Sequence, residues 1–339
     1  MRILIVGDTH FHNWKYKQMV DFQDRFMSKI LPETVGKYKP DILVFLGDIF
    51  ESRTSVDKRI LANFVECLRK LSSVPIIYFV LGNHDIYTAN DQNSLKFLEA
   101  FANVRIITEP TVEKLNSACY AFLPWGSWEK KGMPVNIKGC RYIFSHIEIK
   151  GLKYHPRLEK KSSVGFDAKE FGKGSIVFNG HFHIPSEEHV GDITIINVGS
   201  IFQTNISEVG FKKRLIFLDT TSGNIEQIYL DHPVFVLVES LAEYQELVSK
   251  KYDPMHIPYY NVSRIKLAEM ERTQDFDVFG VIQDLDELAS ISIINEALRG
   301  VERIYEGLDE VSRKYVSLDE LKYIIKKYYE SSDYSILKE

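Results

Sequence analysis

Five apolar segments of the chain end in side chains that can bind a metal ion. The segments read IVGDTHFH, VFLGDIFE, VLGNHDIY, YIFSHIEI and VFNGHFHI. The polar side chains that they supply are those of Asp8, His10, Asp48, Asn83, His84, His146, His181 and His183. Carboxylate, imidazole and amide groups together suit divalent first-row metal ions, and the lack of cysteine in these segments argues against a structural zinc site.

The number of these donors points to two ions rather than one. A single histidine at such a position is more often an ordinary core residue, but five polar endings of this kind are improbable by chance. So many ligands exceed what one ion binds, and they suit two ions that share a carboxylate. Two ions roughly 3.5–4 Å apart can hold a phosphodiester and activate a water molecule. The residues therefore predict a two-metal hydrolytic site.

The first third of the chain contains the elements that would position these residues. Strands are expected at residues 2–6, 41–46 and 74–81, and amphipathic helices at 14–37, 56–71 and 93–103. This alternation indicates a parallel sheet with crossover helices. Because the carboxyl ends of such strands lie at one edge of the sheet, Asp8, Asp48 and Asn83 should meet in one cleft.

From about residue 104 the helical patterns largely disappear and short apolar runs follow one another. We expect strands at 104–107, 118–123, 141–145, 175–178, 193–197 and 214–218. These strands predict a second sheet, mostly antiparallel, packed on the first. The expected fold class is therefore α/β, with two packed β-sheets flanked by helices.

The segment LDHPVFVLVES at 230–240 is interpreted as a domain boundary. After it we expect a helix near 241–250, a strand at 259–267 and a helix near 285–298, followed by a helical tail with an apolar stripe at 318–328. The predicted domains are a catalytic domain at 1–229, a small α+β capping domain at 230–305 and a tail at 306–339.

Composition narrows the classes of partner. The chain has 339 residues, 45% of them hydrophobic, with a formal net charge of -5. A protein that holds nucleic acid by charge alone is usually basic. If this chain binds DNA, its basic surface must be local, or metal ions and a partner must help.

The three cysteines, Cys67, Cys119 and Cys140, match no zinc or redox spacing, and we expect them to be reduced and mostly buried. No stretch approaches the ~20 apolar residues that a membrane span needs. The apolar run at the N-terminus is cut off by Asp8 too early for a signal peptide. The expected location is the cytoplasm, or the host cytoplasm for a phage protein, without a membrane association.

Taken in order, Asp-x-His, Gly-Asp, Gly-Asn-His-Asp, His and Gly-His-x-His resemble the signature of the calcineurin-like metallophosphoesterases, over roughly residues 1–220. The resemblance implies a four-layer sandwich of that family. Within it, the segments GDIFESRTS, AFLPWGSWE and NVGSIFQTN are most similar to SbcD-type nucleases and their phage counterparts. Those proteins are the nuclease subunits of recombination and repair complexes with an SMC-like, SbcC-type ATPase.

The resemblance implies a role for each motif residue. One metal ion would be bound by Asp8, His10, Asp48 and His183, and the other by Asp48, Asn83, His146 and His181. Asp48 would bridge the two ions, which are expected to be Mn²⁺, with Mg²⁺, Fe²⁺ or Zn²⁺ as alternatives. His84 would be the catalytic histidine that contacts the phosphate.

The chain also departs from the group's pattern. Glu51 stands three residues after Asp48, where these nucleases often carry histidine, Ser145 precedes His146 where glycine is usual, and Gln203 replaces the usual Pro or Arg. A carboxylate beside His84 would favour its charged form. We therefore expect Glu51 and His84 to form an acid-catalysis dyad, the alternative being a solvated Glu51 at the mouth of the cleft.

Three further expectations concern binding surfaces. A basic loop after His146 would follow a DNA backbone or would simply be solvated; its cations are Lys150, Lys153, Arg157, Lys160 and Lys161. The resemblance implies that helices 56–71 and 93–103 form a homodimer interface, the alternative being that they face their own sheet. It also implies that the stripe at 318–328 docks on the ATPase, although any packed amphipathic helix shows such a stripe.

The leading functional expectation is a metal-dependent DNA exonuclease or endonuclease acting near DNA ends. A phosphodiesterase or phosphatase acting on small molecules or nucleotides would use the same site, and a non-catalytic scaffold would not need the complete ligand set. The residues beyond 230 favour a macromolecular substrate.

Overall fold

The computed structural model describes residues 1–87, 93–115, 118–127, 136–153, 155–156, 161–238 and 253–260. The chain divides into two compact units, and the first comprises residues 1–204, 208–234 and 252–257. This first unit contains all the expected metal ligands. The expected capping domain and tail lie almost entirely outside the described residues, so their bounds stay a prediction.

The first sheet has six strands in the order β12-β11-β1-β2-β3-β4. Its strands are β1 (Arg2–Val6), β2 (Ile42–Phe45), β3 (Ile76–Val80), β4 (Val104–Ile107), β11 (Arg214–Asp219) and β12 (Asn224–Tyr229). Strands β1 to β3 run parallel, as expected, and β4 pairs parallel with β3, whereas β11 pairs antiparallel with β1 and β12 with β11. The runs at 104–107 and 214–218 therefore belong to this sheet and not, as expected, to the second.

The second sheet also has six strands, in the order β5-β6-β7-β8-β10-β9. Its strands are β5 (Thr111–Leu115), β6 (Ala118–Leu123), β7 (Tyr142–Ser145), β8 (Ile176–Asn179), β9 (Ser186–Val190) and β10 (Ile193–Asn197). The expectation of a mostly antiparallel sheet is wrong, because the central strands β6, β7, β8 and β10 are parallel and only the edge pairs are antiparallel. The sequence of the long crossovers between these strands shows no helical periodicity, which is the usual signal of parallel pairing.

The core lies between the two sheets. Alternate residues of the first sheet, such as Ile3, Ile5 and Val44, share one buried cluster with aromatic residues of the second. Phe122, Phe144 and Phe178 form a ladder across β6, β7 and β8, with ring centroids 5.4 and 5.7 Å apart. This packing confirms the two-sheet sandwich predicted from the sequence.

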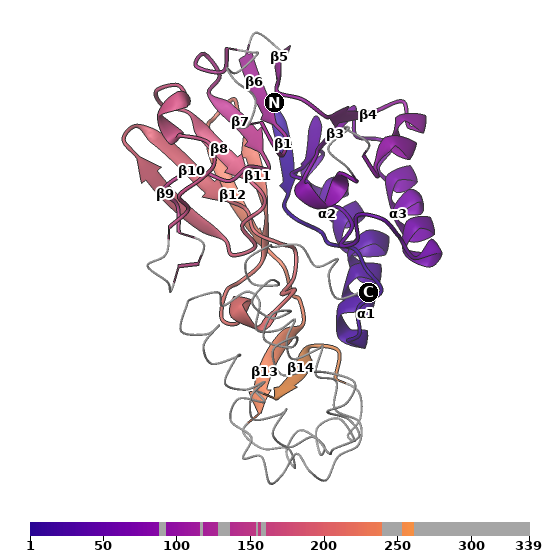
Figure 1. Ribbon diagram of the computed structural model, residues 1–339. Coiled ribbons are helices and arrows are strands. Elements are labelled where there is room, and N and C mark those ends of the chain that lie inside the picture. Colours follow the sequence, from indigo (N-terminus) through magenta and orange to yellow (C-terminus); the bar gives the residue numbers. More distant parts are fainter. Residues whose placement is uncertain are drawn as a thin grey trace, which may run out of the picture. The chain divides into compact units, whose positions relative to one another are not determined.

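The helices cover the other face of the first sheet (Figure 1). They are α1 (Lys17–Arg25), a π-helical turn η1 (Phe26–Ile30), α2 (Leu31–Tyr38) and α3 (Lys58–Lys70). Asp57 caps α3 by accepting the Arg59 N–H at 2.8 Å, and Phe64 packs on Phe45 and Phe79 of the sheet. The helix expected at 93–103 is instead a short 3₁₀ helix, η3 (Lys96–Ala100).

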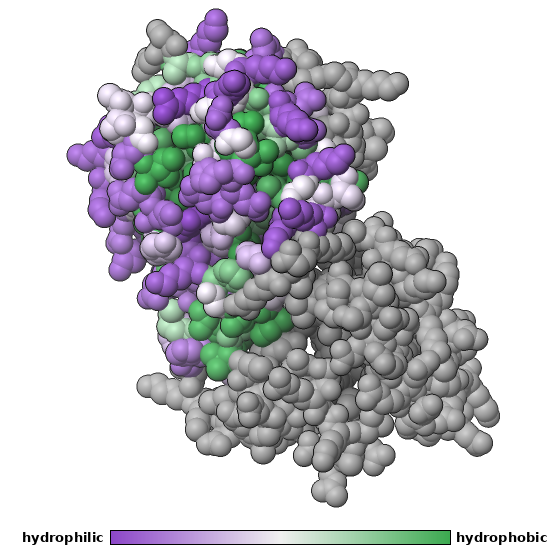
Figure 2. Space-filling view, turned by 90° about the vertical axis from the view of Figure 1, so that its left-hand side faces the viewer, coloured by the Kyte–Doolittle hydropathy of each residue, from purple (hydrophilic) through white to green (hydrophobic). Residues whose placement is uncertain are grey.

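The remaining elements are short. They are the 3₁₀ turns η2 (Asn83–Asp85), η4 (Ala168–Glu170) and η5 (Ile206–Glu208), and a two-stranded sheet of β13 (Val234–Val238) and β14 (His256–Tyr260). Within the described ranges no helix is both long and apolar enough to cross a bilayer. The face shown in Figure 2 is largely hydrophilic where it is described, with hydrophobic side chains visible between the polar ones.

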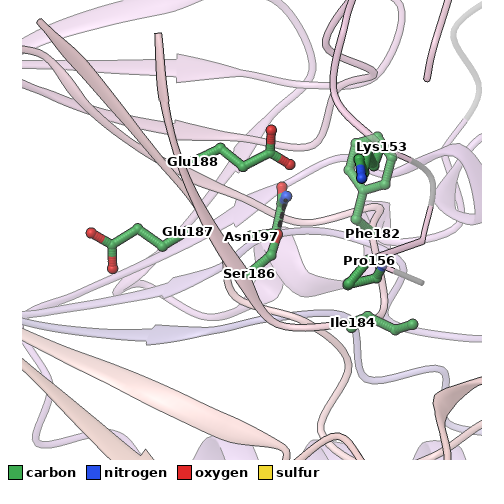
Figure 3. A pocket seen from close by; sticks show the side chains of 8 residues that line it. All are labelled: Lys153, Pro156, Phe182, Ile184, Ser186, Glu187, Glu188 and Asn197. Carbon is green, nitrogen blue, oxygen red and sulfur yellow. Dashed lines mark hydrogen bonds between the residues drawn. The ribbon is translucent and has the colours of Figure 1, made fainter. Parts of the chain in front are cut away.

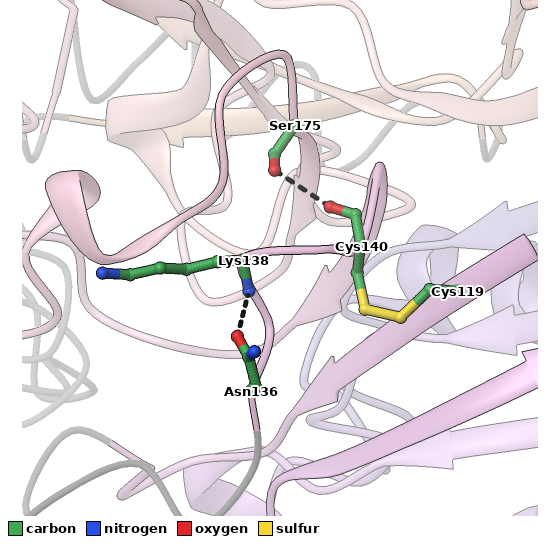
Figure 4. Close-up of a disulfide and its surroundings, with 5 residues drawn as sticks. All are labelled: Cys119, Asn136, Lys138, Cys140 and Ser175. Atoms are coloured by element: carbon green, nitrogen blue, oxygen red, sulfur yellow. Dashed lines mark hydrogen bonds between the residues drawn. A yellow bond between two sulfur atoms is a disulfide. The ribbon is translucent and has the colours of Figure 1, made fainter.

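Two cysteines differ from expectation. Cys119 and Cys140 form a disulfide (Figure 4), whereas Cys67 is free and buried. The two residues are 21 positions apart in the sequence, but β6 and β7 pair with Tyr120 opposite Tyr142, which brings both cysteines to the same end of the strand pair. The expectation of three reduced thiols is therefore wrong for this structure, because it considered only sequence spacing.

Candidate metal centre

The predicted ligands follow the carboxyl ends of five strands taken from both sheets. Asp8 and His10 follow β1, Asp48 follows β2, and Asn83 follows β3. In the second sheet, His146 follows β7, and His181 and His183 follow β8. All seven side chains lie in one connected group, as their contacts below show. The structure thus brings together every residue that the motifs singled out as a ligand.

The backbone of these loops is constrained by close approach. His10, Asp48 and His181 have positive φ values of 42°, 50° and 68°, a region that non-glycine residues rarely adopt. Gly82 is required beside Asp48, because a Cβ at this glycine would lie 2.1 Å from Asp48 Oδ1. The Asp48 carboxylate in turn accepts the His84 N–H at 2.8 Å. The two strand-end loops are therefore interlocked.

In the first part of the group, hydrogen-bond acceptors face one another. His10 Nδ1 lies 2.6 Å from the Glu51 carboxylate, so this nitrogen carries the hydrogen and Nε2 carries the lone pair. His10 Nε2 is 2.9 Å from His183 Nε2 and 3.7 Å from Asp48 Oδ2. Asp8 Oδ2, 3.7 Å from His183 Nε2, is buried with no hydrogen-bond partner among the described residues.

The second part repeats this arrangement. His146 Nδ1 donates to the main-chain oxygen of Leu46 at 2.6 Å, which leaves the lone pair on Nε2. That nitrogen lies 3.1 Å from Asn83 Oδ1 and 3.4 Å from Asp48 Oδ2. His181 Nδ1 is 3.2 Å from the same Asn83 oxygen. Asp48 is thus the residue common to both parts.

This convergence of acceptors fits divalent cations. Among the described residues three groups each offer ligand atoms within 4.8 Å of one another. They are Asp8 with His10 and His183, Asp8 with Asp48 and His146, and His10 with Asp48 and His84. Burial alone would lower the pKa of His10, but Glu51, Asp48 and Asp8 outweigh it and raise this pKa to about 10. Burial likewise opposes the charged form of His146, yet Asp48 and Asp8 raise its pKa to about 9. The negative potential that holds these protons would equally hold metal ions.

The expected dyad of Glu51 and His84 has a different geometry from the one anticipated. The Glu51 carboxylate contacts His10, and it is the Glu51 main-chain oxygen that lies 2.5 Å from His84 Nδ1. The ring of His84 stands edge-on to that of His10, with centroids 5.0 Å apart. His84 is therefore oriented by a backbone carbonyl, which leaves its Nε2 available to a substrate.

Asp85 also belongs to this site, although its role was not predicted from the sequence. Its carboxylate accepts the N–H groups of Gly82, Asp48 and Ile49 at 2.9, 2.8 and 3.0 Å. Burial and the nearby Asp48 raise the pKa of Asp85 to about 7, against the effect of these donors. Its position in the Gly-Asn-His-Asp motif was the available signal. Glu208 was also missed, since nothing near it in the sequence marks it.

The basic loop is only partly described. Lys150 and Lys161 are exposed and Lys153 is half-buried, while Arg157 and Lys160 lie outside the described residues. A bridge between Lys153 and Lys161, with the bond from Ser162 N to Leu152 O at 2.8 Å, closes the base of this loop. Lys153 and Lys161 are therefore paired at the base of this loop, and Lys150 lies just before it.

A pocket of about 220 Å³ is lined by Phe182, which stands between His181 and His183 in the sequence, and by Ile184 (Figure 3). Lys153 and Pro156 of the basic loop contribute to its wall. On another side it is bounded by Ser186 and Asn197, which are joined by a hydrogen bond of 2.8 Å. The pocket combines an aromatic ring with polar groups, as ligand sites commonly do.

Comparisons with known proteins agree with this arrangement at the level of the family. An uncharacterized protein of Methanocaldococcus jannaschii is 30% identical over 155 residues, which are 41% of this chain and 58% of that protein. The chain thus spans less than two thirds of that relative's length.

Two solved structures are similar at low identity. One is an archaeal phosphodiesterase, with a TM-score of 0.37, 14% identity, and coverage of 68% of this chain and 100% of that one. The other is a predicted phosphoesterase from Streptococcus pneumoniae, with a TM-score of 0.30, 17% identity, and coverage of 69% and 91%. The family model for calcineurin-like phosphoesterases matches residues 1–191, more than half of the chain. The chain therefore belongs to the calcineurin-like phosphoesterases, a family of metal-dependent phosphoesterases.

Proposed function

We propose that this protein is a two-metal DNA nuclease, the nuclease subunit of an SbcCD-like recombination and repair complex. The observation that carries the two-metal part is the pair of acceptor groups that share Asp48, with imidazole lone pairs facing carboxylate and amide oxygens. The donor set of imidazole, carboxylate and amide suits Mn²⁺, with Mg²⁺, Fe²⁺ or Zn²⁺ as alternatives. Bound ions would supply Lewis acidity and a water molecule of lowered pKa.

The chain's own residues would perform the remaining tasks. His84 is held at Nδ1 by the Glu51 carbonyl, so its Nε2 would contact the scissile phosphate and donate a proton to the leaving oxygen. Glu51 would act through His10, since its carboxylate fixes that ring. Lys150, Lys153 and Lys161 would bind phosphates of the DNA strand outside the reacting position.

DNA, an SMC-like ATPase and a second copy of the chain are the proposed partners. The support for DNA is the basic loop that follows the His146 strand, and the support for the ATPase is the resemblance of the motifs to SbcD-type nucleases. The proposed interface between copies involves α3 and the segment at 93–103. The ATPase would contact the apolar stripe at 318–328, outside the described residues.

A second candidate is hydrolysis of small phosphodiesters. The pocket lined by Phe182 favours it, because the Phe182 ring lies 5.2 Å from the ring of His181, centroid to centroid, and an apolar wall suits the organic part of a small substrate. Its volume of about 220 Å³ is below the range of roughly 300–1,000 Å³ that is usual for small-molecule sites. We therefore rank this function second.

One experiment separates the two. Purified protein with Mn²⁺ is assayed on linear duplex DNA and on bis-p-nitrophenyl phosphate, alone and with a co-expressed SMC-like ATPase, beside Asp48→Ala as the inactive control. DNA cleavage that is lost in the control supports the nuclease. Activity confined to the small ester supports the second candidate, and full activity of Asp48→Ala would refute the two-metal site.

Asp48→Ala is expected to lower either activity on the order of 10³-fold or more, because it removes the acceptor common to both groups. A circular dichroism spectrum like that of the wild type would show that the fold is retained. The tail proposal is tested separately.

A further inference from the structure

A buried ion pair lies behind one of the proposed metal ligands. The side chains of Lys213 and Glu208 are 0% and 1% exposed, and they contact each other directly. Glu208 ends the turn η5, and Lys213 immediately precedes β11. A buried ion pair adds little net stability compared with apolar side chains of the same size. What the pair contacts is therefore more informative than its presence.

All the hydrogen-bonding capacity of Lys213 is used. Its ammonium group donates to Glu208 Oε2, to the main-chain oxygen of His183 at 2.7 Å and to Ser200 Oγ at 2.8 Å. Lysine has three such hydrogens, so each has a partner. One of these bonds fixes the backbone of a proposed metal ligand.

The other oxygen of Glu208 faces the ring of the same ligand. Glu208 Oε1 lies 3.2 Å from His183 Nδ1 and accepts the hydroxyl of Thr204 at 2.6 Å. Thr204 Oγ1 itself is 3.0 Å from His183 Nδ1. Because the threonine hydrogen is committed to the carboxylate, both oxygens next to Nδ1 can only accept from it.

This accounting fixes the tautomer of His183. Nδ1 must carry the hydrogen, so Nε2 carries the lone pair. Nε2 is the atom that faces His10 at 2.9 Å and Asp8 at 3.7 Å, where the first metal ion would be bound. A carboxylate on the far nitrogen of a metal-binding imidazole is a known way to orient the ring and to increase its basicity.

We propose that Glu208 and Lys213 are positioning residues for the metal centre. Glu208, with Thr204, sets the tautomer and the direction of the His183 ring, and Lys213 holds both the carboxylate and the His183 backbone. Neither residue contacts the substrate. This inference rests on the proposed two-metal function, and it predicts that the pair matters for one of the two ions.

The test measures metal binding and not activity alone. Full-length Glu208→Gln is titrated with Mn²⁺ by isothermal calorimetry after removal of metal with EDTA. The glutamine keeps the shape but cannot accept from Lys213, Thr204 and His183 together. We expect about 10–100-fold weaker binding of one ion and an unchanged affinity for the other. Glu33→Gln, which removes a charge from an exposed site on α2, is the matched control and should bind both ions as the wild type does.

Further variants keep the test decisive if Glu208→Gln does not fold. Thr204→Val removes one acceptor without removing a charge, and it should weaken the same ion by a smaller factor. Glu208→Gln combined with Lys213→Met removes both buried charges, so it should fold and still bind that ion weakly. For each folded variant, kcat on bis-p-nitrophenyl phosphate at subsaturating Mn²⁺ should fall and recover when Mn²⁺ is raised.

The outcomes are distinguishable from a failure of the proposed function. If the wild type binds no divalent ion, the two-metal proposal itself fails. If the wild type binds two ions and a folded Glu208 variant binds both with unchanged affinity, the positioning role is overturned and the metal centre stands. Equal weakening of both ions would also overturn it, because the contacts reach only His183.

Discussion

His10 and His146 each present Nε2 to the metal centre because Nδ1 is engaged elsewhere, by a carboxylate in one case and by a main-chain oxygen in the other. The lone pair on Nε2 belongs to the neutral rings. With pKa values of about 10 and about 9, both imidazoles carry a second hydrogen on Nε2 at neutral pH before a metal ion binds. A protonated imidazole cannot bind a metal ion, so binding must release these protons.

We therefore expect Mn²⁺ binding at pH 7 to release about two protons. Since both pKa values lie above the range pH 6–8, the apparent affinity for the pair of ions should rise about 10²-fold per pH unit across it. Calorimetry in two buffers with different ionisation enthalpies measures the proton count. Binding without proton release, or an affinity that falls as pH rises, would contradict the assignment of these residues.

His84→Asn tests the proposed catalytic histidine. Because His84 is oriented by a backbone carbonyl and its Nε2 is available to a substrate, the substitution should lower kcat by about 10²–10⁴-fold and leave Mn²⁺ affinity unchanged. His189→Asn, at an exposed position on β9, is the control and should retain activity. A comparable loss of metal affinity in His84→Asn would mean that His84 is a ligand instead.

The motif residues were predictable from the sequence because each lies directly after an apolar strand. The residue that the Glu51 carboxylate contacts was not predictable, because the choice between His10 and His84 depends on the path of the loop after β2. Glu208 and Lys213 were also not predictable. They meet His183 through tertiary contacts with segments 25 and 30 residues further along the chain.

At the scale of elements, Asp85 joins the loops that follow β2 and β3. Its carboxylate accepts three N–H groups, one of them from Asp48 in its left-handed conformation. Asp85→Asn would place an amide donor against these N–H groups. A buried N–H group that loses its acceptor costs about 1–3 kcal/mol, so we expect the free energy of unfolding to fall by roughly that amount.

Urea unfolding of the metal-free protein measures this effect. Asp192→Asn, in the exposed turn between β9 and β10, should change the free energy of unfolding by less than about 0.5 kcal/mol. If Asp85→Asn were as stable as the wild type, the carboxylate would not be what joins the two loops.

The elements of the first sheet were predicted correctly where strands alternate with long amphipathic helices. The prediction failed where that local signal is missing. Parallel pairing of β6, β7, β8 and β10 depends on crossovers whose residues show no helical period. The sequences of β4 and β11 are those of ordinary short strands and do not indicate that both belong to the first sheet. Which sheet a strand joins, and whether Cys119 and Cys140 can form a disulfide, both depend on which strands become neighbours. The sequence of a single strand does not determine its neighbours.

At the scale of the whole molecule, all proposed ligands precede residue 184, and the chain continues to residue 339. We predict that removal of residues 308–339 leaves Mn²⁺-dependent hydrolysis of bis-p-nitrophenyl phosphate within about twofold of the full chain. The same truncation should weaken binding to the ATPase at least about tenfold, a loss of roughly 1.4 kcal/mol. Calorimetry with the purified ATPase measures the affinity of each form. Equal affinities of the truncated and full-length proteins would show that the tail is not part of the interface.

The proposed ligands come from both sheets, with Asp8 and Asp48 on one and His146, His181 and His183 on the other. An ion bound by ligands from both sheets would cross-link the two halves of the sandwich. Ligands that bind only the native chain stabilise it by about 2.7 kcal/mol at a hundred times their dissociation constant. A shortage of metal ions would then have two effects on this protein: loss of catalysis and a lower free energy of unfolding.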